Sequence, residues 1–340
     1  FAIGFDFAQA VSLTMDGNNV EFVEGDVTVS GGVLSIKRSI FGFAYGEKNI
    51  VITDVDGKTI TVSATLVTKT LMNATDYSNW IKIANACEAE NQILGGYFKL
   101  GANITSKTMV TFERYDVDGK LGFKGVFDGC GYAIDGLTAT GNAFISCMTK
   151  DGVLRNIAFT NAKIAGESNF LCSGGKGIIE NVFVQYTAIS QGNAKGYNAT
   201  IANMQDGCAL RNIFVDASNA VVSGNGANFR ILTSAVAGGF GGVFGVCPSE
   251  NYTPSQAIGN RGNNYSAIAY FVSFAELKAK TETKSVLSAW NDNGFWIVKD
   301  GVPMPKNLTV TALNLGAKDI DLDVMVDGDN VSLNDSAVTF

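Results

Sequence analysis

The chain has 340 residues with a formal net charge of −7, and it contains 39 glycines, 4 prolines and no histidine. This length suits two or three domains, whereas the missing imidazoles exclude Ser-His-Asp and Cys-His catalysis and histidine-ligated zinc within the chain. The acidic balance argues against nucleic acid as a partner, and no apolar run is long enough for a membrane span.

From Val11 to Leu71, apolar and polar side chains alternate between short turns, which is typical of antiparallel strands. Turn signals stand at Asp16-Gly17, Gly31-Gly32 and Asp56-Gly57. Their spacing and composition predict a small Ig-like β-sandwich over residues 1–72.

The pattern changes after Asn73, where apolar residues recur at helical spacing behind a plausible N-cap. These residues are Tyr77, Trp80, Ile81, Ala84 and Cys87. We expect one amphipathic helix here, and we expect it to cover the N-terminal end of the region that follows.

Internal repetition dominates residues 95–269, where short apolar strands alternate with glycine and asparagine turns. Three segments of the type Gly-x-Leu-Arg-Asn-Ile-x-Phe place Asn156, Asn181 and Asn212 at one position, at offsets of 25 and 31 residues. Variable spacing around a constant strand pattern predicts coils of a parallel β-helix, because the turns tolerate insertions while the strands stay stacked.

Further copies of the repeat unit are weaker. A degenerate copy at 132–137 places Gly136 at the asparagine position, 20 residues before Asn156. An upstream strand is expected in each unit, at 143–147, 169–172 and 200–204, and 242–247 is interpreted as one more strand of this kind.

Asparagine suits the repeated position because its amide bonds to its equivalents one coil above and below, and its backbone accepts a sharp bend. We therefore predict a structural ladder of Asn156, Asn181 and Asn212. The residues before these asparagines, which would alternate in charge along an outer face, are Arg155, Glu180 and Arg211.

The region after the repeats predicts a closing cap. Ser273–Glu276 has the pattern of a capping box that opens a short helix, and Trp290 and Trp296 follow before two prolines. The capped β-helix is therefore expected to span residues 73–307.

The tail resembles the start of the chain. Asp327-Gly328 lies in a segment similar to that around Asp16-Gly17. Residues 308–340 are therefore predicted to begin a second Ig-like sandwich.

The run 123–137, followed by the Gly-x-Leu-Arg-Asn-Ile-x-Phe copies, resembles a known family. It is similar to the right-handed parallel β-helix segments of bacterial surface and adhesin-type proteins, including those with the glycine-rich repeats called GLUG. The resemblance covers roughly residues 80–305. It implies immunoglobulin-like modules on either side and an extracellular stalk or adhesive role, commonly without catalytic activity.

The six cysteines include no Cys-x-x-Cys pair, which argues against zinc and thioredoxin-like sites. Cys147 and Cys172 would stack on adjacent coils under the 25-residue offset. They are interpreted as small buried apolar residues, and a disulfide stays open as the alternative.

Acidic turns at 54–58, 116–120 and 319–329 offer oxygen ligands for calcium, but none fits an EF-hand loop. Hairpin turns are the favoured interpretation, so no metal or other cofactor is predicted.

A β-helix can also support polysaccharide cleavage by clustered carboxylates with a cation nearby. The candidates by position are Asp116, Asp118, Asp128 and Asp135, with Arg114 or Arg155. Nothing in the sequence brings these residues together, so an enzyme is the minority interpretation.

The sequence as a whole predicts an all-β protein in which a right-handed parallel β-helix with short capping helices lies between Ig-like sandwiches. We expect a non-enzymatic extracellular structural or adhesive module of a large cell-surface protein, displaying its β-helix to glycans or other proteins, with self-association into a homo-oligomer left open. The leading alternative is a phage virion fibre or decoration protein, where unpaired thiols would suit assembly in a reducing cytoplasm. A polysaccharide lyase or hydrolase is the second alternative.

Overall fold

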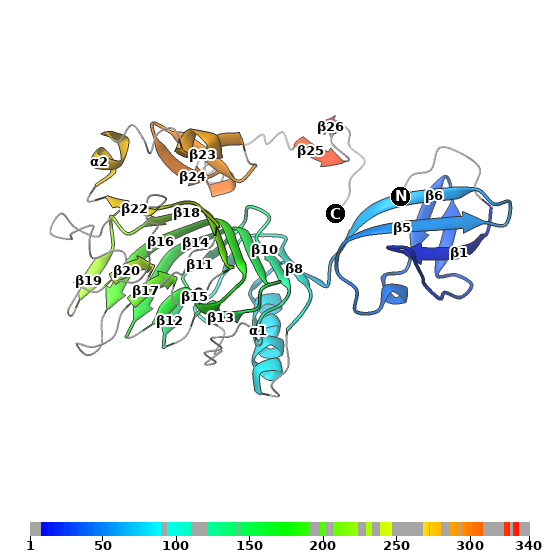
Figure 1. The fold of residues 1–340 in the computed structure, drawn as a ribbon, viewed down its shortest axis with the longest axis horizontal. Helices are drawn as coiled ribbons and strands as arrows, with labels where there is room; N and C mark the ends of the chain where they lie inside the picture. The colour runs from blue at the N-terminus through cyan, green and yellow to red at the C-terminus, as the bar shows by residue number, and fades with distance from the viewer. Residues whose placement is uncertain are drawn as a thin grey trace.

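The protein is mostly β, as predicted, and strands build an antiparallel N-terminal module followed by a parallel β-solenoid (Figure 1). The computed structural model describes residues 8–89, 94–109, 122–141, 143–166, 168–190, 198–201, 204, 207–223, 229–232, 239–246, 268–271, 273–279, 286–292, 294–308, 323–326 and 329–332.

The N-terminal module is made of two small antiparallel sheets, ordered β2-β1-β5-β6 and β3-β4. Its elements are β1 (Ala10–Met15), β2 (Asn18–Asn19), β3 (Val27–Ser30), β4 (Val33–Ile36), the 3-10 turn η1 (Arg38–Phe41), β5 (Gly46–Asp54) and β6 (Thr59–Leu66). Both sheets share one apolar core, which includes Leu13, Leu34 and Ile52. The described strands do not show the strand order of an Ig-like sandwich.

The predicted hairpin turns are confirmed. Asp16 and Gly17 have φ values of 52° and 81°, and Gly31 and Gly32 have 59° and 75°. Each pair is the whole loop of a two-residue hairpin, of the kind that needs positive φ at both positions.

The chain passes from the module to the solenoid within two residues. Strand β6 ends at Leu66, and β7 (Lys69–Leu71) pairs in parallel with β8 (Tyr97–Leu100) of the solenoid. The change of sheet therefore falls at Val67 and Thr68, whereas the sequence placed the domain boundary after residue 72.

The solenoid confirms the prediction of a parallel β-helix. One wall is a 12-stranded sheet and the other a four-stranded sheet, and the described pairings within both are parallel. The first wall contains β7, β8, β9 (Ile104–Thr105), β10 (Val126–Asp128), β11 (Ala133–Asp135), β12 (Thr138–Thr140), β14 (Val153–Ala165), β16 (Ile178–Ser190), β18 (Ala209–Asp216), β19 (Val221–Ser223), β21 (Gly239–Val246) and β22 (Ile268–Phe271). The second contains β13 (Ile145–Met148), β15 (Asn169–Gly175), β17 (Asn198–Ile201) and β20 (Phe229–Leu232).

Gly136 does not occupy the asparagine position, so this prediction was wrong. Strand β10 pairs with β14 so that Asp128 lies opposite Arg155, which puts Gly129 opposite Asn156. Gly136 instead follows Asp135, which pairs with Thr160, and so stands opposite Asn161. Gly136 and Asn161 both have positive φ, as Asn156 does, so the residue types alone did not distinguish one bend from the other.

Cys147 and Cys172 do not stack, which corrects the second register prediction. Cys172 lies opposite Ile145, and Cys147 lies opposite Gly174. The offset on this wall is 27 residues, and it becomes 25 on the other wall because the turn after β15 is two residues shorter than the turn after β13.

The segment 242–247 was also placed on the wrong wall. Residues Gly239–Val246 form β21, which pairs with β18 in the larger sheet. The strand that precedes β21 on the smaller wall is β20. The glycine-rich sequence of 242–247 resembles the upstream strands in hydropathy, but its strand pairs in the larger sheet.

Glycines line one corner of the solenoid, where the strands of successive coils begin. Gly96, Gly125, Gly152 and Gly177 lie in register. A Cβ atom on Gly177 would lie 2.5 Å from the carbonyl oxygen of Gly152, and one on Gly125 or Gly152 would meet a backbone carbonyl of the preceding coil. The coils can therefore approach this closely only because the corner residues are glycines, which have no Cβ atom.

We expect Gly177→Ala to destabilise the solenoid by about 1–3 kcal/mol, because the backbone of an adjacent coil must shift. Urea unfolding followed by tryptophan fluorescence measures this change, since Trp80, Trp290 and Trp296 all lie outside the N-terminal module. The exposed Lys150→Ala is the control and should change stability by less than about 0.5 kcal/mol. Equal unfolding midpoints for the two variants would contradict the crowded corner.

Helix α1 (Ala74–Ala89) forms where the sequence predicted it. Asn73 caps it, accepting hydrogen bonds through Oδ1 from the backbone N–H groups of Thr75 (2.9 Å) and Asp76 (3.0 Å). Trp80 is buried against Phe127 and Phe144, with ring centroids 4.9 and 5.6 Å apart. The helix thereby joins the aromatic interior of the first coils.

The predicted closing cap lies along the outer face of the larger sheet (Figure 1). This C-terminal cover consists of α2 (Phe274–Ala279), η4 (Ala289–Asp292), β23 (Trp296–Lys299) and β24 (Val302–Pro305). Its aromatic side chains pack on outward-facing rings of three successive coils: Trp296 contacts Phe183, Phe274 contacts Phe214, and Trp290 contacts Phe244. Without this cover, those rings would form an apolar stripe in water.

The tail forms a hairpin of β25 (Asp323–Val326) and β26 (Asp329–Ser332). Val326 pairs with Asp329, as Met15 pairs with Asn18, so the same two-residue spacing separates both strand pairs. Leu308 packs against the C-terminal cover, and the remaining residues of the predicted second sandwich lie outside the described residues.

Candidate functional site

A line of hydrogen-bonded asparagines runs along a bend of the larger wall. Asn181 Nδ2 donates to Asn156 Oδ1 (2.9 Å), and Asn212 Nδ2 donates to Asn181 Oδ1 (3.0 Å). All three have φ of 52°, a left-handed backbone that asparagine tolerates better than most residues. The structure thus places the three residues of the expected ladder directly over one another.

The two ends of the ladder differ. At the first end, Asn156 Nδ2 donates to Asp128 Oδ1 (3.2 Å), so a carboxylate takes the place of a fourth amide. At the other end, Gly242 stands opposite Asn212, with φ of 95°. A Cβ atom on Gly242 would lie 3.1 Å from the Trp290 ring, so the C-terminal cover fills the space above the last amide.

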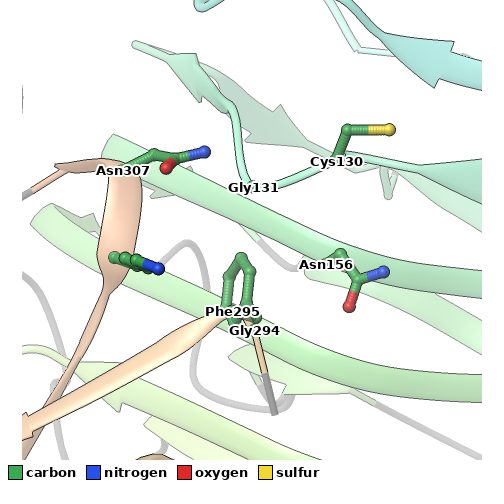
Figure 2. Close-up of a pocket in the computed structure, with 7 residues that line it drawn as sticks. Cys130, Gly131, Asn156, Gly294, Phe295 and Asn307 are labelled. Carbon is green, nitrogen blue, oxygen red and sulfur yellow. The ribbon is translucent and has the colours of Figure 1, made fainter. Parts of the chain in front are cut away.

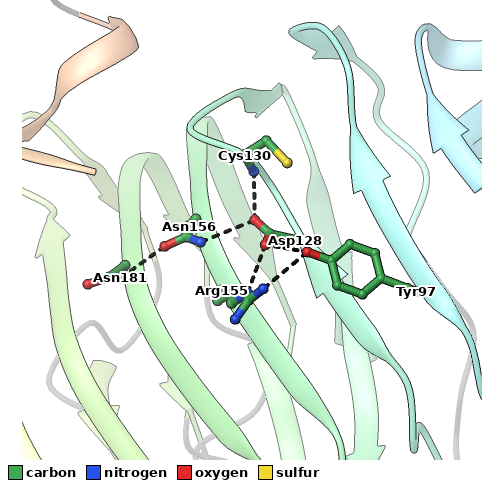
Figure 3. A network of polar contacts seen from close by, with 6 residues as sticks. All are labelled: Tyr97, Asp128, Cys130, Arg155, Asn156 and Asn181. Atoms are coloured by element: carbon green, nitrogen blue, oxygen red, sulfur yellow. Dashed lines mark hydrogen bonds and ion pairs between the residues drawn. The ribbon is translucent and has the colours of Figure 1, made fainter. Parts of the chain in front are cut away.

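Asp128 is the centre of a closed polar cluster (Figure 3). Its Oδ2 accepts from Arg155 Nε (2.7 Å) and from the Tyr97 hydroxyl (2.9 Å). Its Oδ1 accepts from the Cys130 backbone N–H (2.9 Å) and from Asn156. Four donors match the about four lone-pair sites of a carboxylate, which leaves no acceptor position for a substrate proton.

The charge states in this cluster are fixed by mutual contacts. Burial alone would favour the neutral form of Arg155, but hydrogen bonds to Tyr97 and Asp128 hold its pKa above the ordinary value. Burial raises the pKa of Tyr97, and the hydrogen bond from Arg155 offsets this only in part. At neutral pH the cluster therefore contains a guanidinium cation and a neutral phenol.

Among the other predicted catalytic residues, Asp135 is the described one, and it does not join Asp128 and Arg155. Asp135 accepts instead from Thr160 Oγ1 (2.7 Å) and Asn161 Nδ2 (2.6 Å), at the bend that Gly136 and Asn161 form. The positions of Asp116, Asp118 and Arg114 lie outside the described residues. Of the six candidates, the structure brings together one carboxylate and one cation.

A cavity of about 240 Å³ lies between the bend at Asn156 and the C-terminal cover (Figure 2). It is lined by Cys130, Gly131, Asn156, Gly294, Phe295, Lys306 and Asn307. This cavity was not predictable from the sequence, because its two walls come from segments far apart in the chain that meet only when the cover folds back.

Cys130 is the exposed thiol at this cavity, and burial of part of the group, with the nearby Asp128 charge, raises its pKa to about 11. We expect iodoacetamide to modify Cys130 about 100 times more slowly at pH 7.5 than a small thiol of pKa near 9, because only the thiolate reacts. Peptide mass spectrometry measures the rate, with N-acetylcysteine as the control. Rapid labelling at neutral pH would contradict a raised pKa.

Burial of the cysteines is confirmed for part of the set. Cys147, Cys172 and Cys208 are buried, whereas Cys130 is exposed, and the side chains of Cys87 and Cys247 lie outside the described residues. The Cys172 thiol donates to the carbonyl oxygen of Gly174 (3.1 Å).

The predicted alternation of charge is present beside the ladder. Lys99, Asp128, Arg155, Glu180 and Arg211 lie in register on five successive strands. The ion pair of Arg155 with Asp128 is short (2.7 Å), whereas that of Arg211 with Glu180 is long (3.9 Å) and half exposed. The first pair therefore contributes most of the stabilisation, because exposed pairs contribute little.

The acidic turns that were considered for calcium behave as turns where they are described. Asp54 is buried and accepts from the backbone N–H groups of Ala8, Asp56 and Lys58. Burial favours its neutral form, but these donors outweigh that effect and lower its pKa. The turn at 116–120 lies outside the described residues, as do most of residues 319–329. No group of three or more metal-ligating side chains gathers among the described residues.

Removal of a ladder amide tests how much the line of asparagines stabilises the coils. We expect Asn181→Gly to cost about 1–3 kcal/mol, because two side-chain hydrogen bonds are lost while the backbone conformation remains accessible. Asn181→Ala should cost about 1–2 kcal/mol more, since alanine resists positive φ. Tryptophan-detected urea unfolding measures both, and wild-type stability of Asn181→Gly would show that the ladder contributes nothing.

Comparison of the chain with family models, with curated proteins and with solved structures found no match. In the part of the chain that the structure describes, no helix is both long and apolar enough to cross a membrane.

Proposed function

We propose that this chain is a non-enzymatic, extracellular structural or adhesive module of a large repetitive surface protein. In this proposal the solenoid is a rigid spacer that displays its surface to glycans or proteins. The proposal extends to the finer architecture: a right-handed coil, as parallel crossovers are in about 98% of cases, between Ig-like modules. The proposal also includes the family that the sequence resembles, bacterial surface proteins with GLUG-like repeats.

The observation that supports this role most is the closed polar line from Asp128 to Asn212. Each amide bonds to the next, and the carboxylate at its start is surrounded by four donors. A polar network satisfied from within stabilises and orders a structure. Such a network favours a scaffold over a reaction centre.

The experiment is surface labelling of the source organism with antibodies raised against the purified chain. We expect intact cells to bind the antibody and to lose this binding after mild external protease treatment. Beads coated with the chain should also adhere to glycan-bearing or protein-coated surfaces more than beads coated with albumin. Labelling only after cell lysis would overturn the proposal.

The cysteine chemistry keeps a virion fibre or decoration protein as a second candidate. Cys172 is a buried thiol and Cys130 an exposed one, which suits assembly in a reducing cytoplasm. Co-purification of the chain with phage capsid proteins on a density gradient would favour this candidate over the cell surface.

The contact of Asp128 with Arg155 keeps a polysaccharide lyase or hydrolase as the third candidate. Its test is incubation with capsular and plant polysaccharides, followed by assays for unsaturated ends and new reducing ends. Activity in the wild type that is lost in Asp128→Asn would establish it. No product from any polysaccharide would remove it.

A further inference from the structure

A cavity of about 470 Å³ lies where the N-terminal module meets the solenoid. The residues that matter for its chemistry are Arg38, Ser39, Phe43, Tyr45, Thr68 and Gly95. Its volume falls within the range of about 300–1,000 Å³ of small-molecule sites, which often form between domains. It is separate from the cavity at Cys130.

Phe43 presents an aromatic ring to solvent at the rim of this cavity. Its side chain is 100% exposed, whereas the next most exposed large apolar residue among those described, Val221, is 70% exposed. Exposure of a whole phenyl ring is unfavourable in water, so the position suits a residue that contacts something else.

The loop that carries Phe43 is held in place by Arg38. The guanidinium donates to the carbonyl oxygens of Gly42 (3.1 Å), Ala44 (2.5 Å) and Val67 (3.5 Å). These bonds clamp both sides of Phe43 and tie the loop to the joint with the solenoid. The backbone that carries the ring is therefore already ordered, so the loop loses less conformational entropy when a ligand binds.

The inner wall of the cavity combines a second aromatic ring with hydroxyl groups. The Tyr45 phenol lies close to the backbone of Gly95, since a Cβ atom there would be 3.4 Å from its oxygen. Thr68 Oγ1 accepts from the Tyr97 backbone N–H (2.9 Å), so its own O–H can donate into the cavity. The lining contains no carboxylate, and Arg38 uses three of its five N–H groups in the loop.

We propose that this cavity binds a saccharide unit, with the C–H face of one pyranose ring on Phe43 and ring hydroxyls on Arg38 and Thr68. A sugar ring has an apolar face and a rim of hydroxyls, which is the arrangement that this lining complements. The inference rests on the proposed adhesive role and gives it a ligand class and a location. It moves glycan contact from the β-helix surface to the joint before it.

The test is binding of the full chain to an array of immobilised neutral and acidic saccharides, followed by calorimetric titration with the best-retained one. We expect Phe43→Ala to weaken binding at least about tenfold, which corresponds to about 1.4 kcal/mol for one aromatic contact. Phe43→Trp should retain binding, because it keeps an aromatic face. Val221→Ala, another exposed apolar residue, is the matched control, and the thermal midpoint of each variant shows that folding is unchanged.

Three outcomes would overturn the inference, and they separate it from the proposed function. Retention of a saccharide with equal affinity by wild type and Phe43→Ala would place the glycan site elsewhere and leave adhesion intact. Retention of no saccharide, together with bead adhesion to protein-coated surfaces that Phe43→Ala abolishes, would make this cavity a protein-docking site. Loss of every form of adhesion in the wild type would remove the proposed function as well.

Discussion

Asp128→Ala is expected to destabilise the solenoid by about 2–4 kcal/mol, because it breaks a partly buried ion pair and leaves several hydrogen-bond donors without their acceptor. The side chain of Asp128 is 7% exposed, and its removal leaves the Arg155 cation without its carboxylate. It also takes away the acceptor of Tyr97, Cys130 N–H and Asn156. In this variant the first amide of the ladder, Asn156, has no acceptor for its Nδ2 hydrogen bond.

Urea unfolding followed by tryptophan fluorescence measures this loss, and Asp151→Ala is the control because Asp151 is exposed in the next turn. The control should change stability by less than about 0.5 kcal/mol. Asp128→Asn keeps an acceptor oxygen without the charge and is expected to fall between the two. A value for Asp128→Ala within error of the control would mean that water replaces the carboxylate without cost.

Phe144→Ala is expected to cost about 3–5 kcal/mol, because it leaves a cavity in the aromatic interior beneath α1. Phe144 is fully buried and contacts Trp80, Phe127 and Phe159, at centroid distances of 5.6, 5.1 and 4.9 Å. The ring therefore connects the helix with two coils. Its loss should weaken the attachment of α1 as well as the coil itself.

The measurement is the urea midpoint together with the emission wavelength of the folded protein, which should shift to the red as Trp80 becomes hydrated. Phe43→Ala removes the same side chain at an exposed position and serves as the control. Phe144→Leu refills part of the cavity and should recover part of the loss. Unchanged stability of Phe144→Ala would contradict the interior that Trp80 and Phe144 share.

Prediction from the sequence succeeded where one residue type met one structural need. Asparagine at 156, 181 and 212 marks a bend that requires positive φ and a side-chain amide, and few other residues satisfy both. The hairpins at Asp16-Gly17 and Gly31-Gly32 and the helix with Trp80 followed from equally specific patterns.

Prediction failed where different positions accept the same residue. Gly136 and Gly129 both lie in a Phe/Ile-Asp-Gly context, so the sequence alone did not show which one aligns with Asn156. The offset that aligned Cys147 with Cys172 ignored a turn that shortens by two residues between the walls. Register on each wall depends on such local lengths, which hydropathy does not report.

The candidate site was predictable only in part. The charge alternation of Arg155, Glu180 and Arg211 follows from the repeat, and so does their shared face. The contact of Asp128 with Tyr97 depends on the first coils, which have Leu100 and Gly129 in place of asparagine at the ladder position. The cavity at Cys130 depends on the returning cover. The cover itself was predicted as an end cap, because its tryptophans show burial but not against which surface.

The two-residue joint at Val67 and Thr68 has a mechanical consequence for a chain under tension. Force applied through the N-terminal module reaches the solenoid along β7, which is bonded side by side and in parallel to β8. Pulling on such a strand shears all its backbone bonds together instead of opening them one at a time. The first coil is thus joined to its neighbour in the geometry that resists stretching.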